Sequence, residues 1–360
     1  MRKVKSVKIR NRAVGPGQHC YIVAEAGGNA NSDLKIALSL VEKAKWAGAD
    51  AIKFQTYKAN KITTKKAPKY WVDTMEEWER GTRPTGYQYD EFKMLDGLSI
   101  RDYKAIKKKC DEIDITFFST PFDFESVDLL DAIGVPVYKI ASADITYFDF
   151  IRYIAQKGKP IIMSTGASNL DEVKQAVGII EETGNNKLIL LQCTLHYPCK
   201  HNEVHINAMK TLMNEFPNYP IGLSDHSLGT LAPIVAAANG AQLIEKHFTI
   251  DKGLDKSTDH FISVDLHELK EMVESIREVP DIMGNAIKQP DPSEESARRY
   301  ARRSVTTVKK VKKGNLITKE NTLCRRPGTG ISPTRYKDVL SKKAKIDIDE
   351  EILLDWEMLA

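Results

Sequence analysis

The chain has 360 residues, and its 53 lysine and arginine residues nearly balance 49 aspartate and glutamate residues, leaving a net charge of +4. This balance gives no reason to expect a nucleic-acid partner. The N-terminus lacks the apolar core of a signal peptide, and no apolar run reaches the roughly 18 residues that a membrane helix needs. The five cysteines are scattered along the chain, which fits reduced thiols. We therefore expect a cytoplasmic protein with no membrane partner.

The first predicted element is a hairpin over residues 3–19, with turn signals at Gly15-Pro16-Gly17. It is placed to close the bottom of a larger fold. Eight short apolar segments then recur, and near-continuous apolar runs are typical of strands buried on both faces of a parallel sheet. These strands are predicted at residues 20–27, 51–57, 116–122, 137–142, 160–166, 188–194, 220–226 and 242–249.

Amphipathic helices are predicted between most of these strands. Apolar residues at helical spacing mark residues 33–47, 147–156, 170–183, 207–215 and 266–277. Strands that alternate with helices in this way are typical of a (β/α)8 TIM barrel, an α/β fold. An open doubly wound sheet is the alternative, but the first strand is not followed by a glycine-rich G-x-G-x-x-G turn. The sequence therefore predicts a barrel domain over residues 1–287.

Three stretches fall outside the alternation of strands and helices. The connection over residues 58–99 is too long for an ordinary loop and is predicted to be a lid or interface segment. Residues 288–303 are polar and contain prolines, which predicts a linker. Residues 304–360 show short strands and turns, which predicts a small β-rich domain. Such a domain buries little core alone, so we expect it to pack against a barrel or a partner chain.

Polar side chains recur at the predicted carboxyl ends of the strands, where barrel enzymes carry their catalytic groups. Lys53, Lys139 and Lys246 can neutralise phosphate or carboxylate oxygens. The hydroxyls of Ser164 and Thr165 can hydrogen-bond to the same group. A single lysine at a strand end is most often a solvated head on a buried stem. Polar groups at all eight strand ends instead indicate one site for an anionic substrate.

Two histidines, His226 and His247, end neighbouring strands of the predicted barrel. They can hold one divalent metal with open positions for water and substrate, although hydrogen-bonded histidines at a barrel mouth are the alternative. Glu25 ends the first strand, which lies beside the eighth in a closed barrel, so it can act as a general base or acid. Cys193 and Cys199 lie near other histidines, but their spacing matches no standard zinc motif.

A series of motifs runs in order along nearly the whole chain: EAGGN, KFQT, STPFD, KIAS, STG, CTLHYP, GLSDHS, EKHFT and RRPGTGIS. This series resembles that of the sialic acid (N-acetylneuraminate) synthase family. The last motif lies in the segment over residues 304–360, which resembles the antifreeze-like (SAF) domain of that family.

The resemblance implies a metal-dependent condensation of phosphoenolpyruvate with the open-chain aldehyde of an N-acylhexosamine, which gives a sialic acid-like nonulosonic acid and phosphate. It implies contacts to phosphoenolpyruvate from Lys53, Lys139, Ser142, Ser164 and Ser224. Gln55, Tyr197 and Asp259 match positions that line the sugar or the intermediate.

The resemblance also implies roles for an acid, a metal and a second subunit. Glu25 matches an acid placed for proton transfer and for positioning the aldehyde. The metal expected on His226 and His247 is manganese, with magnesium or cobalt as alternatives. Arg326 matches an arginine that the small domain inserts into the partner subunit's barrel, which implies a domain-swapped homodimer.

The chain departs from the family pattern at two positions. Ala30 stands where the first motif usually continues with histidine, and we expect it to remove a polar group near the mouth. Leu195 stands where serine or asparagine usually follows the Cys-Thr pair, at a position facing the sugar, which favours a less polar acceptor. An N-acetylmannosamine-like sugar, its 6-phosphate and a 6-deoxy sugar all stay open. Two alternatives stay open: a phosphoenolpyruvate aldol-type synthase on another sugar or sugar phosphate, and a non-catalytic carbohydrate-binding relative.

Overall fold

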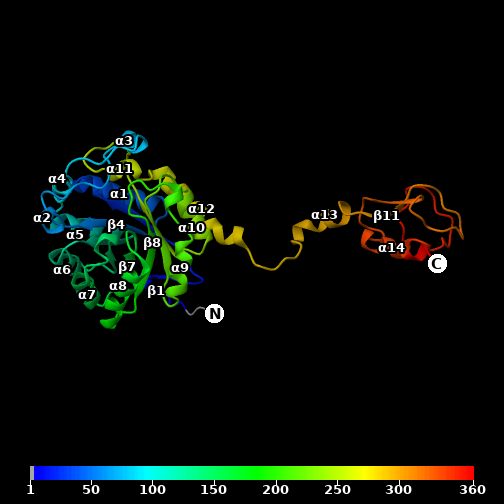
Figure 1. Ribbon diagram of the computed structural model, residues 1–360, viewed down its shortest axis with the longest axis horizontal. Helices are drawn as coiled ribbons and strands as arrows, with labels where there is room; N and C mark the ends of the chain where they lie inside the picture. The colour runs from blue at the N-terminus through cyan, green and yellow to red at the C-terminus, as the bar shows by residue number, and fades with distance from the viewer. Residues whose placement is uncertain (1–3) are drawn as a thin grey trace. The chain divides into compact units, whose positions relative to one another are not determined.

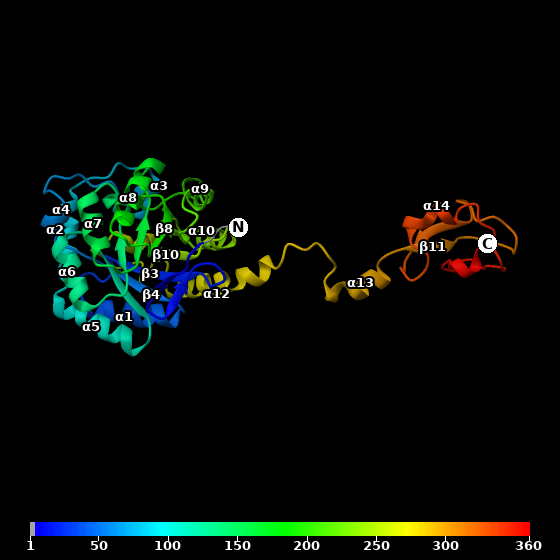
Figure 2. The ribbon, with the colours of Figure 1, turned by 90° about the horizontal axis from the view of Figure 1, so that it is seen from below.

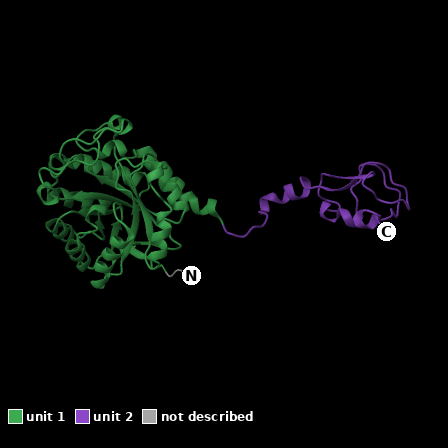
Figure 3. Cartoon of the chain, in the orientation of Figure 1, with its two compact units in different colours: residues 1–284 green, residues 285–360 purple. Residues whose placement is uncertain are grey.

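The computed structural model describes residues 4–360. The chain divides into two compact units, the first ending at Gly284 and the second running from Asn285 to Ala360 (Figure 3). Within residues 4–360, none of the helices combines the length and the apolar character that a membrane span needs.

The first unit contains a closed barrel of eight parallel strands in the order β10-β3-β4-β5-β6-β7-β8-β9. This confirms the predicted (β/α)8 barrel. Pairing of β10 with β3 closes the barrel and sets His247 opposite Glu25. Pairing of β3 with β4 sets Glu25 opposite Lys53. The strands are β3 (Tyr21–Gly27), β4 (Ala51–Thr56), β5 (Thr116–Pro121), β6 (Tyr138–Ile140), β7 (Ile161–Ser164), β8 (Leu188–Cys193), β9 (Ile221–Asp225) and β10 (Leu243–His247).

Helices surround the strands, as Figure 1 and the quarter-turned view in Figure 2 show. Polar side chains cap several helix starts; Asp33, for example, accepts hydrogen bonds from the first turn of α1. The last helix, α12, runs beyond its predicted end at Arg277, because the apolar face continues through Ile276 and Val279, which are buried. The surrounding helices are α1 (Leu34–Trp46), α5 (Ile100–Glu112), α6 (Phe124–Ile133), α7 (Phe148–Gln156), α8 (Leu170–Glu182), α9 (Ala208–Glu215), α10 (Leu231–Ala238) and α12 (Leu266–Met283).

An antiparallel hairpin of β1 (Val7–Ile9) and β2 (Arg12–Val14) precedes the barrel. Lys3, the first residue of the predicted hairpin, lies outside the described residues. The hairpin turns at Arg10, which has a left-handed φ of 52°. Gly15-Pro16-Gly17 instead lies in the connection from β2 to β3. The apolar side chains of the hairpin share one buried cluster with inward-facing barrel residues, including Val23, Phe118 and Ile162.

Asp50 ties three segments together at the amino-terminal end of β4. Its side chain is almost fully buried and forms ion pairs with Arg12 of the hairpin and Arg277 of α12. It also accepts a hydrogen bond of 2.8 Å from the backbone N–H of Ile22. One carboxylate thus links the hairpin, the first barrel strand and the last helix.

Residues 58–99, which we call the strap, form the long connection between β4 and α5. The strap contains three short helices, α2 (Ala59–Ile62), α3 (Met75–Glu79) and α4 (Gln88–Leu95). A second irregular connection follows β10 and contains α11 (Asp259–Ile262). We call residues 257–263 the Asp259 loop. Two further short elements lie near strand ends, η1 (Ser142–Asp144) and η2 (His201–Glu203).

The second unit is rich in short elements, as its sequence predicts. Its antiparallel pair of strands, β11 and β12, covers a small apolar core that includes Val305, Ile331 and Leu354. The segment predicted as a linker contains η3 and α13. The elements are η3 (Pro292–Glu294), α13 (Glu295–Tyr300), β11 (Ser304–Thr307), β12 (Thr322–Arg325), η4 (Pro333–Arg335), α14 (Tyr336–Val339) and η5 (Trp356–Met358).

Replacing Asp50 by asparagine should lower the free energy of unfolding of the barrel by about 2–3 kcal/mol, because the buried carboxylate that pairs with Arg12 and Arg277 loses its charge. Urea unfolding followed by circular dichroism measures the change. Asp171→Asn, at an exposed position in the first turn of α8, is the control and should stay within about 0.5 kcal/mol of wild type. Equal midpoints for the two variants would contradict the role given to Asp50.

Candidate active site

A cavity of about 310 Å³ lies at the carboxyl ends of the barrel strands. The strands bring most of the predicted site residues together there, because the ends of parallel strands in a barrel meet at one mouth. The predicted residues that line the cavity are Glu25, Lys53, Gln55, Lys139, Ser142, Ser164, Leu195, Tyr197, Ser224, His226, His247 and Asp259.

Two lysines and two glutamates form the floor of the cavity, and all four are buried. Lys53 Nζ lies 2.7 Å from Glu25 Oε2 and 3.8 Å from Glu245 Oε2, while Lys139 Nζ lies 3.4 Å from Glu245 Oε1. We refer to these four residues as the floor.

Burial and neighbouring charges oppose each other on the floor. Burial disfavours the charge on Lys53, but Glu245 and Glu25 together raise its pKa above the ordinary value. Burial and the neighbouring Lys53 lower the pKa of Lys139, against the attraction of Glu245. Burial would raise the pKa of Glu245, but Lys139 and Lys53 hold it well below its ordinary value. The floor therefore holds the side chains of Lys53 and Lys139 in fixed positions before any anion arrives.

Three buried serine hydroxyls surround the floor. Ser142 Oγ accepts a hydrogen bond of 2.9 Å from the backbone N–H of Gly166, and Ser224 Oγ donates one of 3.0 Å to Glu245. Ser164 Oγ is buried and has no hydrogen-bond partner among residues 4–360. A buried hydroxyl without a partner carries a free-energy cost that a ligand oxygen would remove.

The rings of His226 and His247 lie with their centroids 5.4 Å apart at the cavity wall. His226 Nδ1 donates to the backbone carbonyl of Thr194 at 2.8 Å, which directs Nε2 toward other partners. Buried His247 has no hydrogen-bond partner at Nδ1 among the described residues. Burial lowers the pKa of His247 to about 3, so its imidazole is neutral at physiological pH.

The two histidines suit a divalent cation that keeps several open positions. Neutral imidazole nitrogens are ordinary ligands of such ions. Burial lowers the pKa of His226, but Cys193 and the Thr194 carbonyl more than offset this and raise it. Residues 4–360 contain no group of three or more histidine, cysteine or acidic side chains arranged to hold a metal. Water and substrate oxygens would have to complete the coordination.

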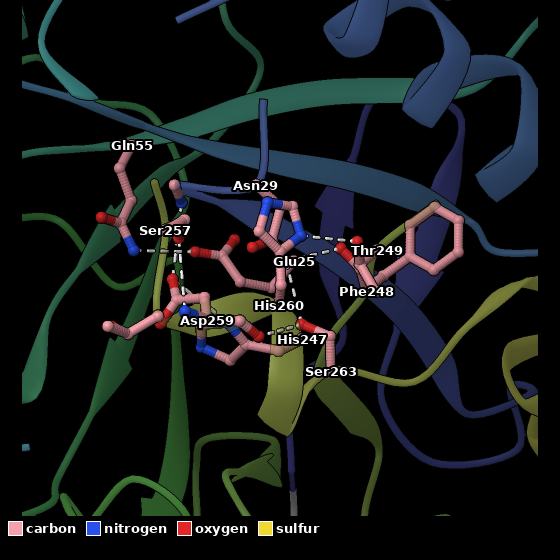
Figure 4. Close-up of polar contacts among 12 residues, drawn as sticks. Glu25, Asn29, Gln55, His247, Phe248, Thr249, Ser257, Asp259, His260 and Ser263 are labelled. Carbon is pink, nitrogen blue, oxygen red and sulfur yellow. Dashed lines mark hydrogen bonds and ion pairs between the residues drawn. The ribbon is translucent and has the colours of Figure 1, made fainter. Parts of the chain in front are cut away.

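Asp259 lies against the Gly27-Gly28 turn at the end of β3 (Figure 4). Its Oδ2 accepts a long hydrogen bond of 3.4 Å from the Gly28 N–H and lies 3.6 Å from His247 Nδ1. Gly27 has a φ of +50°, and a Cβ there would lie 2.8 Å from Asp259 Oδ2. Glycine is therefore required for this approach.

Glu25 lies beside Asp259 in the same view (Figure 4) and accepts a hydrogen bond of 3.1 Å from Gln55 Nε2. Burial raises the pKa of Asp259. Two carboxyl groups with different environments, one paired with Lys53 and one against a glycine turn, can take different roles in proton transfer.

Two predicted substrate contacts, Lys246 and Thr165, lie outside the cavity. Successive residues of a strand point to opposite faces, so Glu245 and His247 face the cavity while Lys246 faces the surrounding helices. Lys246 Nζ donates to Asp225 Oδ2 at 2.7 Å and to the Ser227 carbonyl. Thr165 Oγ1 donates to the Leu191 carbonyl at 2.9 Å. Both side chains join neighbouring segments of the barrel.

The two departures from the family pattern lie in different surroundings. Ala30 is buried in the larger apolar cluster and is not among the residues that line the cavity, and the expectation that it removes a polar group near the mouth stays a prediction. Leu195 does line the cavity, next to Tyr197, whose ring centroid lies 4.1 Å from that of His226. Arg326 is exposed in the second unit.

Glu245 and Asp144 line the cavity but were not among the predicted site residues. The alternation that turns Lys246 away would have identified Glu245, because it shares a face with His247. Asp144 lies two residues beyond Ser142, in η1. Its buried Oδ2 has no hydrogen-bond partner among residues 4–360. Burial raises the pKa of Asp144 to about 7, although Lys139 lowers it.

The upper part of the cavity is aromatic. Tyr70, Trp71 and Phe92 come from the strap, Tyr57 follows β4, and Phe261 belongs to the Asp259 loop. We call these five residues the aromatic wall. The sequence predicted the strap as a lid or interface segment but identified none of these side chains. The cavity thus combines a charged floor with a wall suited to the less polar parts of a ligand.

Comparison with family models identifies two matches. The NeuB family model matches residues 40–288, and the SAF domain model matches residues 302–360.

Individual relatives match over most or nearly all of the chain. A protein of Methanocaldococcus jannaschii described as uncharacterized is 40% identical over 99% of both chains. The N,N'-diacetyllegionaminic acid synthase of Legionella pneumophila is 38% identical, over 99% of this chain and 98% of its own. The crystal structure of an N-acetylneuraminic acid (sialic acid) synthetase from Leptospira borgpetersenii, 31% identical, covers 81% of this chain and 95% of its own with a TM-score of 0.70.

Asp144→Asn should raise the melting temperature, and by more at about pH 8 than at about pH 5. The pKa of this carboxyl is raised from 3.8 to about 7, so the folded chain binds the proton more tightly than the unfolded chain. The stability that the protonated carboxyl contributes is therefore complete below its pKa in the unfolded chain. It is lost as the pH rises toward its pKa in the folded chain. Thermal unfolding at both pH values measures the difference. Asp149→Asn, exposed on α7, is the control. An increase in melting temperature that is the same at both pH values for Asp144→Asn would contradict the raised pKa as its cause.

Proposed function

Because the chain belongs to the NeuB family and carries an SAF domain, we propose that it condenses phosphoenolpyruvate with an N-acylated amino sugar. The products are a nonulosonic acid and inorganic phosphate. The observation that carries this proposal is the cavity itself, in which two buried lysines lie beside a histidine pair and beneath an aromatic wall.

Phosphoenolpyruvate would occupy the floor. It carries a phosphate and a carboxylate, and Lys53 and Lys139 offer one ammonium group each within the same buried network. Ser164 Oγ would gain the partner that it lacks. Ser142 and Ser224 lie on either side and hold their hydroxyls in place through existing hydrogen bonds. Fixed donors of this kind need no reorganisation when charge develops on the phosphate.

The reaction joins C3 of phosphoenolpyruvate to the aldehyde carbon of the acceptor; water then adds at C2, and phosphate leaves by C–O cleavage. A divalent cation held by His226 and His247 would supply Lewis acidity toward the aldehyde oxygen when bound. Manganese is the proposed ion, with magnesium and cobalt as alternatives. Glu25 and Asp259 flank this position and are assigned the proton transfers, since each carboxyl group lies against the Gly27 turn.

The acceptor would lie against the aromatic wall. Lys53 and Lys139 are the lysines that line the cavity, and both lie on the floor. The five side chains of the wall carry no positive charge, and nearby Lys69 Nζ, 5.9 Å from the centroid of the Trp71 ring, is already paired with Glu91 at 3.0 Å. Leu195 adds a further apolar side chain where the sugar would lie. We therefore propose an acceptor without phosphate, N-acylated and deoxygenated. The relative from Legionella pneumophila, whose name records two N-acetyl groups, supports the N-acylation of the acceptor.

Phosphate release from phosphoenolpyruvate tests the proposal. Release should require a divalent cation and an acceptor, should stop with a chelator, and should be at least about tenfold faster with an N-acylated 6-deoxy sugar than with its 6-phosphate analogue, because the wall cannot compensate a phosphate charge. Leu195→Ser should narrow that preference, with Leu195→Met as the volume-matched control. Folded protein that released no phosphate with any acceptor would contradict the proposed reaction. A preference for the 6-phosphate would contradict the acceptor.

We also propose that the active form is a homodimer in which Arg326 of one subunit completes the partner subunit's cavity. Arg326→Ala and Asp259→Ala should each lose most activity alone. Mixed dimers should regain about a quarter of wild-type activity, because half of the dimers carry one intact site. Measuring activity after the two variants are unfolded and refolded together tests this. Activity that stayed at the level of the separate variants would contradict the exchange between subunits.

A further inference from the structure

The strap supplies three of the five residues of the aromatic wall, but few of its own side chains are buried. Trp71, Val72 and Glu91 are buried, whereas Tyr70, Tyr87 and Met94 are roughly half exposed. Apolar burial is the main force that fixes a segment on a protein surface. Since the strap buries little apolar surface, its position over the cavity must also depend on specific polar contacts.

Glu91 of α4 makes polar contacts both to residues of the strap and to the Asp259 loop. Its Oε2 accepts a hydrogen bond of 2.9 Å from the indole N–H of Trp71 and lies 3.0 Å from Lys69 Nζ. Its Oε1 accepts hydrogen bonds from Thr258, at 3.2 Å from the backbone N–H and 2.8 Å from the hydroxyl. Thr258 immediately precedes Asp259. One buried carboxylate therefore joins the aromatic wall to the loop that carries a proposed catalytic group.

The Asp259 loop has its own anchors on the barrel side (Figure 4). Asn29 Nδ2 donates to Ser263 Oγ at 2.9 Å. His260 lies 2.7 Å from Thr249 Oγ1 and 3.1 Å from Asn31 Oδ1 through its two ring nitrogens. Asp259 would thus keep its place without the strap. The strap has other anchors on the barrel, such as the hydrogen bond of 3.0 Å from Trp78 Nε1 to the Pro198 carbonyl, and Glu91 is the side chain that ties it to the Asp259 loop.

We propose that Glu91 is a positioning residue that fixes the aromatic wall at a set distance from Asp259, so that acceptor binding and proton transfer share one geometry. This role rests on the proposed function. Glu91 acts through Trp71 and Thr258. It governs the acceptor half of the cavity and leaves the floor unchanged, because none of its contacts reaches Lys53 or Lys139.

Glu91→Gln tests the proposal with almost no change in side-chain volume. A carboxylate accepts hydrogen bonds at both oxygens, whereas an amide places two donors on one side. Whichever way the amide turns, N–H groups face either Trp71 and Lys69 or Thr258. The variant therefore loses either the contacts to Trp71 and Lys69 or the contact to the Thr258 backbone N–H. The KM for the acceptor should rise about tenfold while the KM for phosphoenolpyruvate changes by less than about twofold.

Glu76→Gln is the matched control, because Glu76 lies on the same strap with 68% of its side chain exposed and pairs with Arg80. It should leave both KM values unchanged. Thr258→Val removes the hydroxyl donor to Glu91. Its effect should be smaller in the Glu91→Gln background than in wild type, as expected for two residues that share one interaction. Fully additive effects would overturn the pairing.

Amide hydrogen exchange on the full chain gives a readout that does not require turnover. Glu91→Gln should speed exchange in the strap and at Thr258, with the barrel strands unchanged. Faster exchange throughout the barrel, or an equal rise in both KM values, would overturn the positioning role. If the wild-type protein released no phosphate, the proposed function would fail. Unchanged exchange in the strap of Glu91→Gln would instead overturn the role of Glu91.

Discussion

The ion-pair network of Lys53, Lys139, Glu25 and Glu245 is the constraint on which the rest of the site depends. Burying four ionisable groups is costly unless each has a partner in good geometry. Here the partners come from β3, β4, β6 and β10, so the charges are held only when these strands keep their register. The closed barrel thus does more than shelter the site, because it fixes the spacing of the charges. Hydroxyls, histidines and Asp259 are arranged around a network whose charges are already paired without a ligand.

The barrel was predictable from the sequence because buried strands leave a strong local signal, and all eight apolar segments became strands. The positions of most site residues followed, since parallel strand ends must meet. The direction in which each side chain points was harder to predict. Lys246 and Glu245 are neighbours at one strand end, and only the alternation of side chains, fixed by the pairing of His247 with Glu25, places one in the cavity and the other outside. Asp144 lies in a single turn beyond β6, where no periodic pattern indicates which way a side chain points.

The strap marks the limit of what the sequence shows. Its composition indicated that it was not an ordinary loop, but its place over the cavity depends on contacts between residues far apart in the chain, such as Glu91 and Thr258. Its helices are short, and short helices carry little amphipathic signal. The aromatic wall of the cavity, where we propose that the acceptor lies, is built mainly from this segment. Most of the charged floor, built from strands, could be predicted from the sequence, whereas the aromatic wall could not.

The pairing of β10 with β3 also bears on the order in which the molecule folds. Glu25 belongs to the first barrel strand and His247 to the last, yet they are opposite each other. Bringing such distant parts of a chain together costs loop-closure entropy, so this contact forms only when most of the intervening structure is in place. The cavity can therefore exist only after the ring of strands has closed. A chain still emerging from the ribosome has no partly built site that could capture a phosphorylated metabolite or a metal ion before the remaining strands are in place.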